Sequence, residues 1–185
     1  MLIDTKLALT YALITLLPAG NGFASGGKNP GRRPNILIIL ADDLGYGDVK
    51  CYNPTHGKIP TPNIDGLALQ GMRFTDCHSS SGVSSPSRYT LLTGRYHWRT
   101  RLQSGIVNVF EEPLIAPDRL TIADLAKQNG YITTCIGKWH LGMDWPTRDG
   151  KPPVGQGWAG VGDPGSGSNV DFSRPFANGP RARGF

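Results

Sequence analysis

The stretch Asn35-Ile36-Leu37-Ile38-Ile39-Leu40-Ala41-Asp42-Asp43 decides the fold class of this 185-residue chain. Six apolar residues follow Asn35 without a break, and the run ends abruptly at two acids. A strand with one solvated face alternates apolar and polar residues, whereas a continuous apolar run is typical of a central strand buried on both faces. The sequence therefore predicts a buried strand from Asn35 to Ala41 with Asp42 and Asp43 at its end.

Strand-like and helix-like segments alternate along the chain after this strand. Further strands are predicted at Met72–Cys77 and Tyr131–Ile136, and helices at Thr61–Pro62 up to Gly71, from Pro86 with Ser85 as its cap, and from a Thr121/Asp124 capping box up to Gly130. This alternation predicts an α/β fold, a mostly parallel central sheet flanked by helices, with its chemistry at the carboxyl ends of the strands. From Asp144 onward periodicity gives way to Gly, Pro, Ser and Arg, so the compact part is expected to end near residue 145 and loops to follow.

The first 24 residues have the layout of a secretory signal peptide. Lys6 precedes an apolar run from Leu7 to Leu17, and small residues continue through Ala24. The run is shorter than the roughly 20 apolar residues that span a bilayer, so no stable membrane partner is expected. Residues 25–34 are predicted to be a flexible linker, and the protein is expected to be periplasmic or secreted.

The net charge of +5 favours an anionic substrate, but much of the positive charge is interpreted as solvated. Five of the positive charges lie in the predicted linker and near the C-terminal end: Lys28, Arg32, Arg33, Arg181 and Arg183. Such a distribution does not indicate a nucleic-acid partner.

The three cysteines, Cys51, Cys77 and Cys135, cannot all pair within one chain, and their disulfide status stays open. Cys77 and Cys135 lie in apolar strand-like runs, so both are predicted to be small core residues. Their spacing from the histidines is not that of a metal site.

Three polar segments follow predicted strands or begin a predicted helix. Asp42 and Asp43 offer hard oxygen ligands for a divalent cation, although an Asp-Asp pair alone is more often a solvated turn. Residue 84 is predicted to lie just before a helix N-terminus, where partial positive charge favours an anion, and Arg88, one turn into the helix, can hydrogen-bond an oxygen there. By themselves these residues describe a good helix start with a surface arginine.

The third segment, Gly137–Gly142, carries Lys138 and His140, which can point the same way from an extended backbone. A lone Lys or His is usually solvated or structural. Two such side chains at a strand end suit a site that binds an anion or transfers a proton.

Together the three segments resemble the N-terminal motifs of the type I sulfatases, within the alkaline-phosphatase superfamily. The matching segments are Asn35–Asp43, Ser84–Arg88 continued by Leu92–Arg95, and Gly137–Gly142, in this order. The resemblance covers roughly residues 33 to 145 and implies that residues 35–185 are the N-terminal part of a catalytic domain. Cys77 does not fit the middle motif, because serines stand two and four residues after it.

The resemblance implies that Ser84 is converted to formylglycine, as in a bacterial subset of the family, by a serine-type maturase. The hydrated aldehyde would attack the sulfur of a sulfated small molecule or polysaccharide. Asp42, Asp43 and residue 84 would hold Ca²⁺, with Mg²⁺ as an alternative.

The same resemblance gives roles to three basic residues. Arg88 would orient the diol, Lys138 would bind sulfate and diol oxygens, and His140 would take the proton of the second hydroxyl so that sulfate is expelled.

Two other functions stay open. A phosphatase or phosphodiesterase of the same superfamily would use Ser84 unmodified. The second alternative is a non-catalytic sulfated-glycan-binding protein or a truncated, inactive fragment, because the resemblance implies further metal ligands and a leaving-group acid beyond Phe185.

Overall fold

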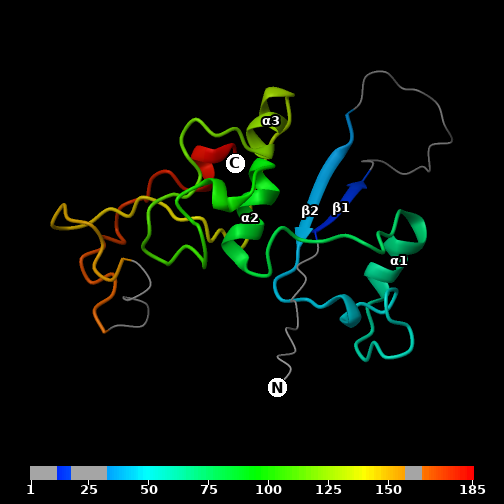
Figure 1. Cartoon of the computed structure of the whole chain (residues 1–185). Coiled ribbons are helices and arrows are strands. Elements are labelled where there is room, and N and C mark those ends of the chain that lie inside the picture. Colours follow the sequence, from blue (N-terminus) through cyan, green and yellow to red (C-terminus); the bar gives the residue numbers. More distant parts are fainter. Residues whose placement is uncertain (1–11, 18–32, 157–163) are drawn as a thin grey trace. The chain divides into compact units, whose positions relative to one another are not determined.

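The computed structural model describes residues 12–17, 33–156 and 164–185 (Figure 1). The chain divides into two compact units, with the boundary in the sequence between Ser79 and Ser80. The first unit contains β1 (Ala12–Leu17), β2 (Asn35–Leu40) and α1 (Pro62–Gln70), and the second contains α2 (Ser84–Thr93) and α3 (Ile122–Gln128). Short 3₁₀ turns cover Tyr46–Asp48, His97–Arg99 and Pro180–Arg183. Each unit is described by itself below.

The predicted strand after residue 34 is present as β2, but its surroundings differ from the prediction. Its partner is β1, which runs antiparallel in the register Ala12 to Leu40 and Leu17 to Asn35. Ile36 and Ile39 keep about half of their surface exposed, at 50% and 51%. A strand is buried on both faces only where other layers cover its sheet, and the described residues supply one neighbouring strand. The parallel sheet is therefore not found in the described part of the chain.

The predicted signal peptide (1–24) and linker (25–34) lie mostly outside the described residues. Within them, Ala12–Leu17 forms β1, so the apolar run is used for strand pairing in this structure. Export stays a prediction. Among the described residues, none of the helices combines the length and apolar character needed to cross a bilayer.

The residues expected at the ends of α1 and at the start of α3 are found there in the structure. Pro62 begins α1 and Gly71 follows its last residue, as predicted. Thr121 caps α3: its hydroxyl accepts a hydrogen bond from the Asp124 backbone N–H at 3.1 Å, and the Asp124 carboxylate accepts one from the Thr121 backbone N–H at 3.0 Å. This reciprocal pair is the predicted capping box.

The two further predicted strands are extended segments that pair with no other strand among the described residues. Ile132 and Ile136 are 99% and 93% exposed, and Met72 and Phe74 are also exposed. Cys77 and Cys135 are exposed as well, so their prediction as core residues is wrong for this structure. An apolar pattern shows that a segment suits burial, but it does not supply the layer that buries it.

The second unit has a small hydrophobic core in which α3 packs beside α2 (Figure 1). Its buried members are Tyr89, Leu102, Val107, Leu114, Ile115, Trp139 and Leu141. The segment after Asp144 is irregular, as predicted, but it is not loose: isolated bridges join Asp144 to Ala177 and Thr147 to Val170, and Phe185 packs against the core. Packing thus continues beyond residue 145.

Candidate active site

The first turn of α2 holds residue 84 in place. Ser84 is the first helical residue and Val83 is the extended residue before it, so the helix begins two residues earlier than predicted. The Ser87 hydroxyl lies 2.8 Å from the Ser81 carbonyl and 2.9 Å from the Val83 carbonyl, which fixes the preceding loop against the helix. The free backbone N–H groups of a helix start make this a favourable place for an anion.

Ser85 connects this turn to the core instead of capping it, which corrects the predicted role. Its side chain is fully buried, and its hydroxyl accepts a hydrogen bond from the Val107 backbone N–H at 3.0 Å. A buried N–H without a partner would cost about 1–3 kcal/mol. Ser85 therefore holds the helix start against the segment that carries Val107, a contact that the sequence alone did not indicate.

Arg88 links the helix start to the third polar segment. Its Nε donates to Ser84 Oγ at 2.8 Å, and one of its terminal nitrogens donates to the Lys138 carbonyl at 2.6 Å. Positions four residues apart on a helix are neighbours, so the first contact follows from spacing. The second joins residues fifty positions apart, and it brings two of the three predicted site segments together.

The Gly137–Gly142 segment is anchored by its apolar residues. Trp139 and Leu141 are buried, whereas Lys138 is exposed and His140 is half-buried. The Trp139 indole donates to the Gly142 carbonyl at 2.9 Å, and the Leu141 carbonyl accepts from the Leu114 backbone N–H at 2.9 Å. The expected extended backbone does not continue through the segment, because His140 has a left-handed backbone with φ +55°. A shared face for Lys138 and His140 therefore stays a prediction.

Gly142 is required by the backbone around this segment. It has φ +73°, and a Cβ there would lie 2.1 Å from the Glu112 carbonyl oxygen. Gly142→Ala is therefore expected to lower the free energy of unfolding by roughly 3 kcal/mol or more, from strain and overlap together. Gly94→Ala is the matched control, because Gly94 also has positive φ but has open space around it, and it should cost only about 1 kcal/mol. Urea unfolding of the two variants measures the difference, and equal losses would contradict the close contact.

Asp42 and Asp43 lie in the first unit, two and three residues beyond the end of β2, and both are exposed. Asp43 has a left-handed backbone, with φ +57°. In the described part of the chain, clusters of three or more His, Cys, Asp or Glu residues that could hold a metal are absent. Carboxylate oxygens are the type of ligand that Ca²⁺ and Mg²⁺ prefer. Two aspartates and residue 84, however, supply fewer oxygen ligands than the six to eight that surround Ca²⁺. A Ca²⁺ site built on these three residues would therefore need further oxygen ligands.

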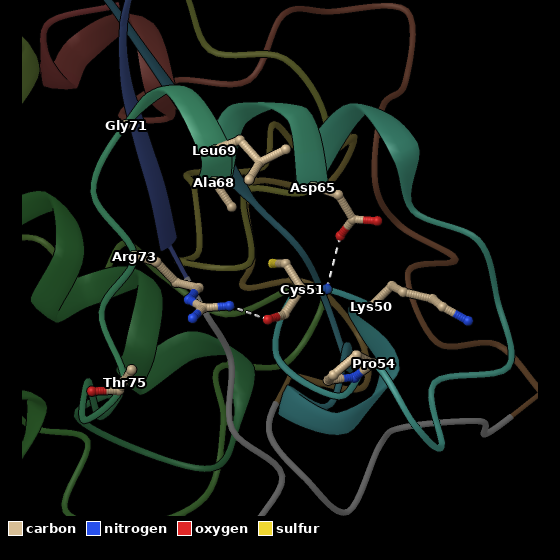
Figure 2. Close-up of a pocket in the computed structure, with 9 residues that line it drawn as sticks. All are labelled: Lys50, Cys51, Pro54, Asp65, Ala68, Leu69, Gly71, Arg73 and Thr75. Carbon is tan, nitrogen blue, oxygen red and sulfur yellow. Dashed lines mark hydrogen bonds between the residues drawn. The ribbon is translucent and has the colours of Figure 1, made fainter.

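A pocket of about 560 Å³ in the first unit is a separate feature (Figure 2). It is lined by Lys50, Cys51, Pro54, Asp65, Ala68, Leu69, Gly71, Arg73 and Thr75. Its polar groups satisfy one another: the Asp65 carboxylate accepts from the Cys51 backbone N–H at 2.8 Å, and the Arg73 guanidinium donates to the Cys51 carbonyl. The pocket contains none of the predicted site residues, so it is not the candidate active site.

Comparison with known proteins finds a matching family and similar chains. The family model described as Sulfatase matches residues 34–180. The chain is 48% identical over 112 residues to N-acetylgalactosamine-6-O-sulfatase of Bacteroides thetaiotaomicron, covering 60% of this chain and 21% of that protein. It is 43% identical over 112 residues to human arylsulfatase A (60% and 22%) and 40% identical over 136 residues to rat steryl-sulfatase (71% and 23%). The chain thus spans about a fifth of the length of these curated relatives.

Proposed function

Because this chain belongs to the sulfatase family, we propose that the full-length protein hydrolyses sulfate esters through a formylglycine made from Ser84. The observation that carries the proposal is the pair of hydrogen bonds from Arg88 to Ser84 Oγ and to the Lys138 carbonyl. These two contacts support the proposal because they join the side chain of residue 84, at a helix start suited to an anion, to the segment that carries Lys138. Relatives named for hydrolysis of sulfated sugars, aryl sulfates and sterol sulfates support the same reaction class.

Formylglycine supplies a hydrated aldehyde with two hydroxyls, one to attack sulfur and one whose deprotonation releases sulfate. A bound divalent cation would polarise the sulfate and lower the pKa of the attacking hydroxyl. Asp42, Asp43 and residue 84 would hold that cation.

Three basic residues of the chain would carry out the other steps of the reaction. Arg88 holds the side chain of residue 84 in one orientation, which removes the need to find that orientation during the reaction. Lys138 would bind the oxygens on which negative charge develops, and His140 would accept the proton of the second hydroxyl. His140 lies between the buried Trp139 and Leu141, so its backbone position is fixed.

The modification itself is directly measurable. In protein made in a host with an anaerobic serine-type maturase, the tryptic peptide from Phe74 to Arg88 should be lighter by two hydrogen atoms, because CH₂OH becomes CHO. Ser84→Ala is the control and should show no such loss. Active full-length protein that carries only unmodified Ser84 would contradict the proposal and favour the phosphatase or phosphodiesterase alternative.

We also propose that the protein is exported through a signal peptide. In that case the maturase would have to modify Ser84 before or during export. Substrates are proposed to be sulfated small molecules or sulfated polysaccharides, and the relatives' names do not separate the two.

A further inference from the structure

A basic and aromatic turn follows helix α2 and is not used by the proposed reaction. This turn, residues 95–101, is called the 95–101 patch below. The rings of Tyr96 and Trp98 stack on each other with 4.0 Å between centroids and 13° between planes, yet they are 48% and 47% exposed. An exposed pair of large aromatic rings marks a surface suited to binding.

The backbone of the patch is ordered by its own hydrogen bonds. The Arg99 backbone N–H donates to the Tyr96 carbonyl at 3.2 Å, and that of Thr100 donates to the His97 carbonyl at 2.8 Å. The Gln103 amide donates to the Trp98 carbonyl at 2.9 Å. A surface that is already ordered loses less conformational entropy when a ligand binds.

The charge of the patch is positive. Arg95, Arg99 and Arg101 lie within seven residues, and residues 84–110 contain no Asp or Glu. Arg101 is paired with Glu111 and Glu112 at 3.3 and 3.4 Å, whereas the Arg99 guanidinium has no hydrogen-bond or ion-pair partner in the described part of the chain. The expectation that positive charge gathers in the linker and at the C-terminal end was therefore incomplete.

His97 adds shape to the patch but little charge. Burial lowers the pKa of its imidazole, which favours the neutral ring. Its ring contacts that of Trp98 edge-on, with centroids 5.2 Å apart. The positive charge available to a ligand is thus that of the arginines.

Resting on the proposed function, we propose that the 95–101 patch binds a sugar chain that carries sulfate groups, at a site separate from residue 84. The apolar C–H face of a sugar ring packs on an exposed aromatic ring, and the planar guanidinium of Arg99 offers paired donors to sulfate oxygens. The ten residues of α2 rise about 15 Å between the catalytic end and this turn, so the patch would hold a part of the chain distant from the sulfate being cleaved.

Two features favour a sugar chain over a nucleic acid. The space between Tyr96 and Trp98 is closed because the rings already stack on each other, so a base cannot insert there. About half of the surface of each of these two residues stays exposed. A sulfated sugar chain is also a substrate class that the proposed reaction would act on, and N-acetylgalactosamine-6-O-sulfatase is among the relatives.

The test uses full-length protein, chondroitin 6-sulfate chains and p-nitrophenyl sulfate. Trp98→Ala and Arg99→Ala should each raise the Kd and the KM for the polymer roughly tenfold, because each removes a ring contact or a cation worth about a factor of ten. Turnover of the small aryl sulfate should stay within about twofold, since it cannot reach the patch. Phe172→Ala and Arg174→Ala are matched controls, as both residues are exposed in the same unit, and they should leave both substrates unchanged.

Several results would overturn the site. One is an unchanged Kd for the polymer in the Trp98→Ala and Arg99→Ala variants, and another is an equal fall in their turnover of the aryl sulfate. Single-stranded DNA that binds the wild-type protein as tightly as the polymer would also contradict it, as would a wild-type dimer that dissociates on Trp98→Ala. If the wild-type protein releases sulfate from no substrate, the proposed function fails, while the Kd for the polymer still decides whether the patch binds it.

Discussion

Replacing His140 with alanine is expected to lower kcat for an aryl sulfate by about a hundredfold to ten-thousandfold, the usual contribution of a positioned general base. The step that suffers should be sulfate release, because the proposed role of His140 is to take the proton that expels sulfate. A rapid first turnover should then be followed by slow release, and protein with sulfate attached covalently should accumulate. Rapid-quench kinetics and intact-protein mass spectrometry measure the two effects.

Lys138→Ala should also reduce turnover strongly, but without a rapid first turnover, because its proposed role is to stabilise charge in the attack itself. The different kinetics of the two variants separate the roles. His78→Ala is the control for His140: His78 is exposed, pairs with Asp76 at 2.6 Å, and matches no motif. If His140→Ala turns over sulfate at the wild-type rate, the ring is a structural residue of the anchored segment. Loss of glycan affinity in a protein with no turnover would favour the binding-protein alternative instead.

Local chemistry explains which parts of the fold could be predicted. The starts of α1 and α3 depend on residues within one turn of each other, as the Thr121 and Asp124 capping box shows. The partner of β2 depends on a pairing between residues 12–17 and 35–40, and nothing in the run Ile36–Ala41 identifies it. The predictions of which residues are buried were wrong for the same reason, because burial also depends on distant parts of the chain. Cys135 has an apolar sequence context, but its exposure is decided by segments far away in the chain.

The candidate site shows the same division. The contact from Arg88 to Ser84 is a four-residue helical contact, and the sequence predicted that Arg88 can reach an oxygen at the helix start. The contacts from Arg88 to the Lys138 carbonyl and from Val107 to Ser85 each cross more than twenty residues, and no local pattern signals them. The 95–101 patch has three arginines with two aromatic residues between them, but no function was predicted for it from the sequence, and the stacking of Tyr96 on Trp98 was found only in the structure.

Asp42→Ala and Asp43→Ala in the full-length protein should each remove bound metal and lower kcat roughly a thousandfold or more, since a metal supplies several kcal/mol of charge stabilisation in such reactions. Each substitution removes a hard oxygen ligand and leaves the other carboxylate without its balancing charge. Metal content by elemental analysis and turnover of an aryl sulfate should fall together. Added Ca²⁺ should restore part of the activity, because a weaker site is filled by mass action.

Asp118→Ala is the matched control for this pair, because Asp118 is an exposed carboxylate in the second unit and belongs to no site segment. It should leave metal content and turnover unchanged, which separates the loss of a ligand from the loss of one negative charge. Asp42→Asn adds a finer comparison: the amide keeps one oxygen ligand but no charge, so partial retention of metal would show that charge contributes beyond coordination. If both alanine variants keep metal and turnover, the two aspartates form a solvated turn after β2, and the divalent cation of the proposed reaction must be held elsewhere.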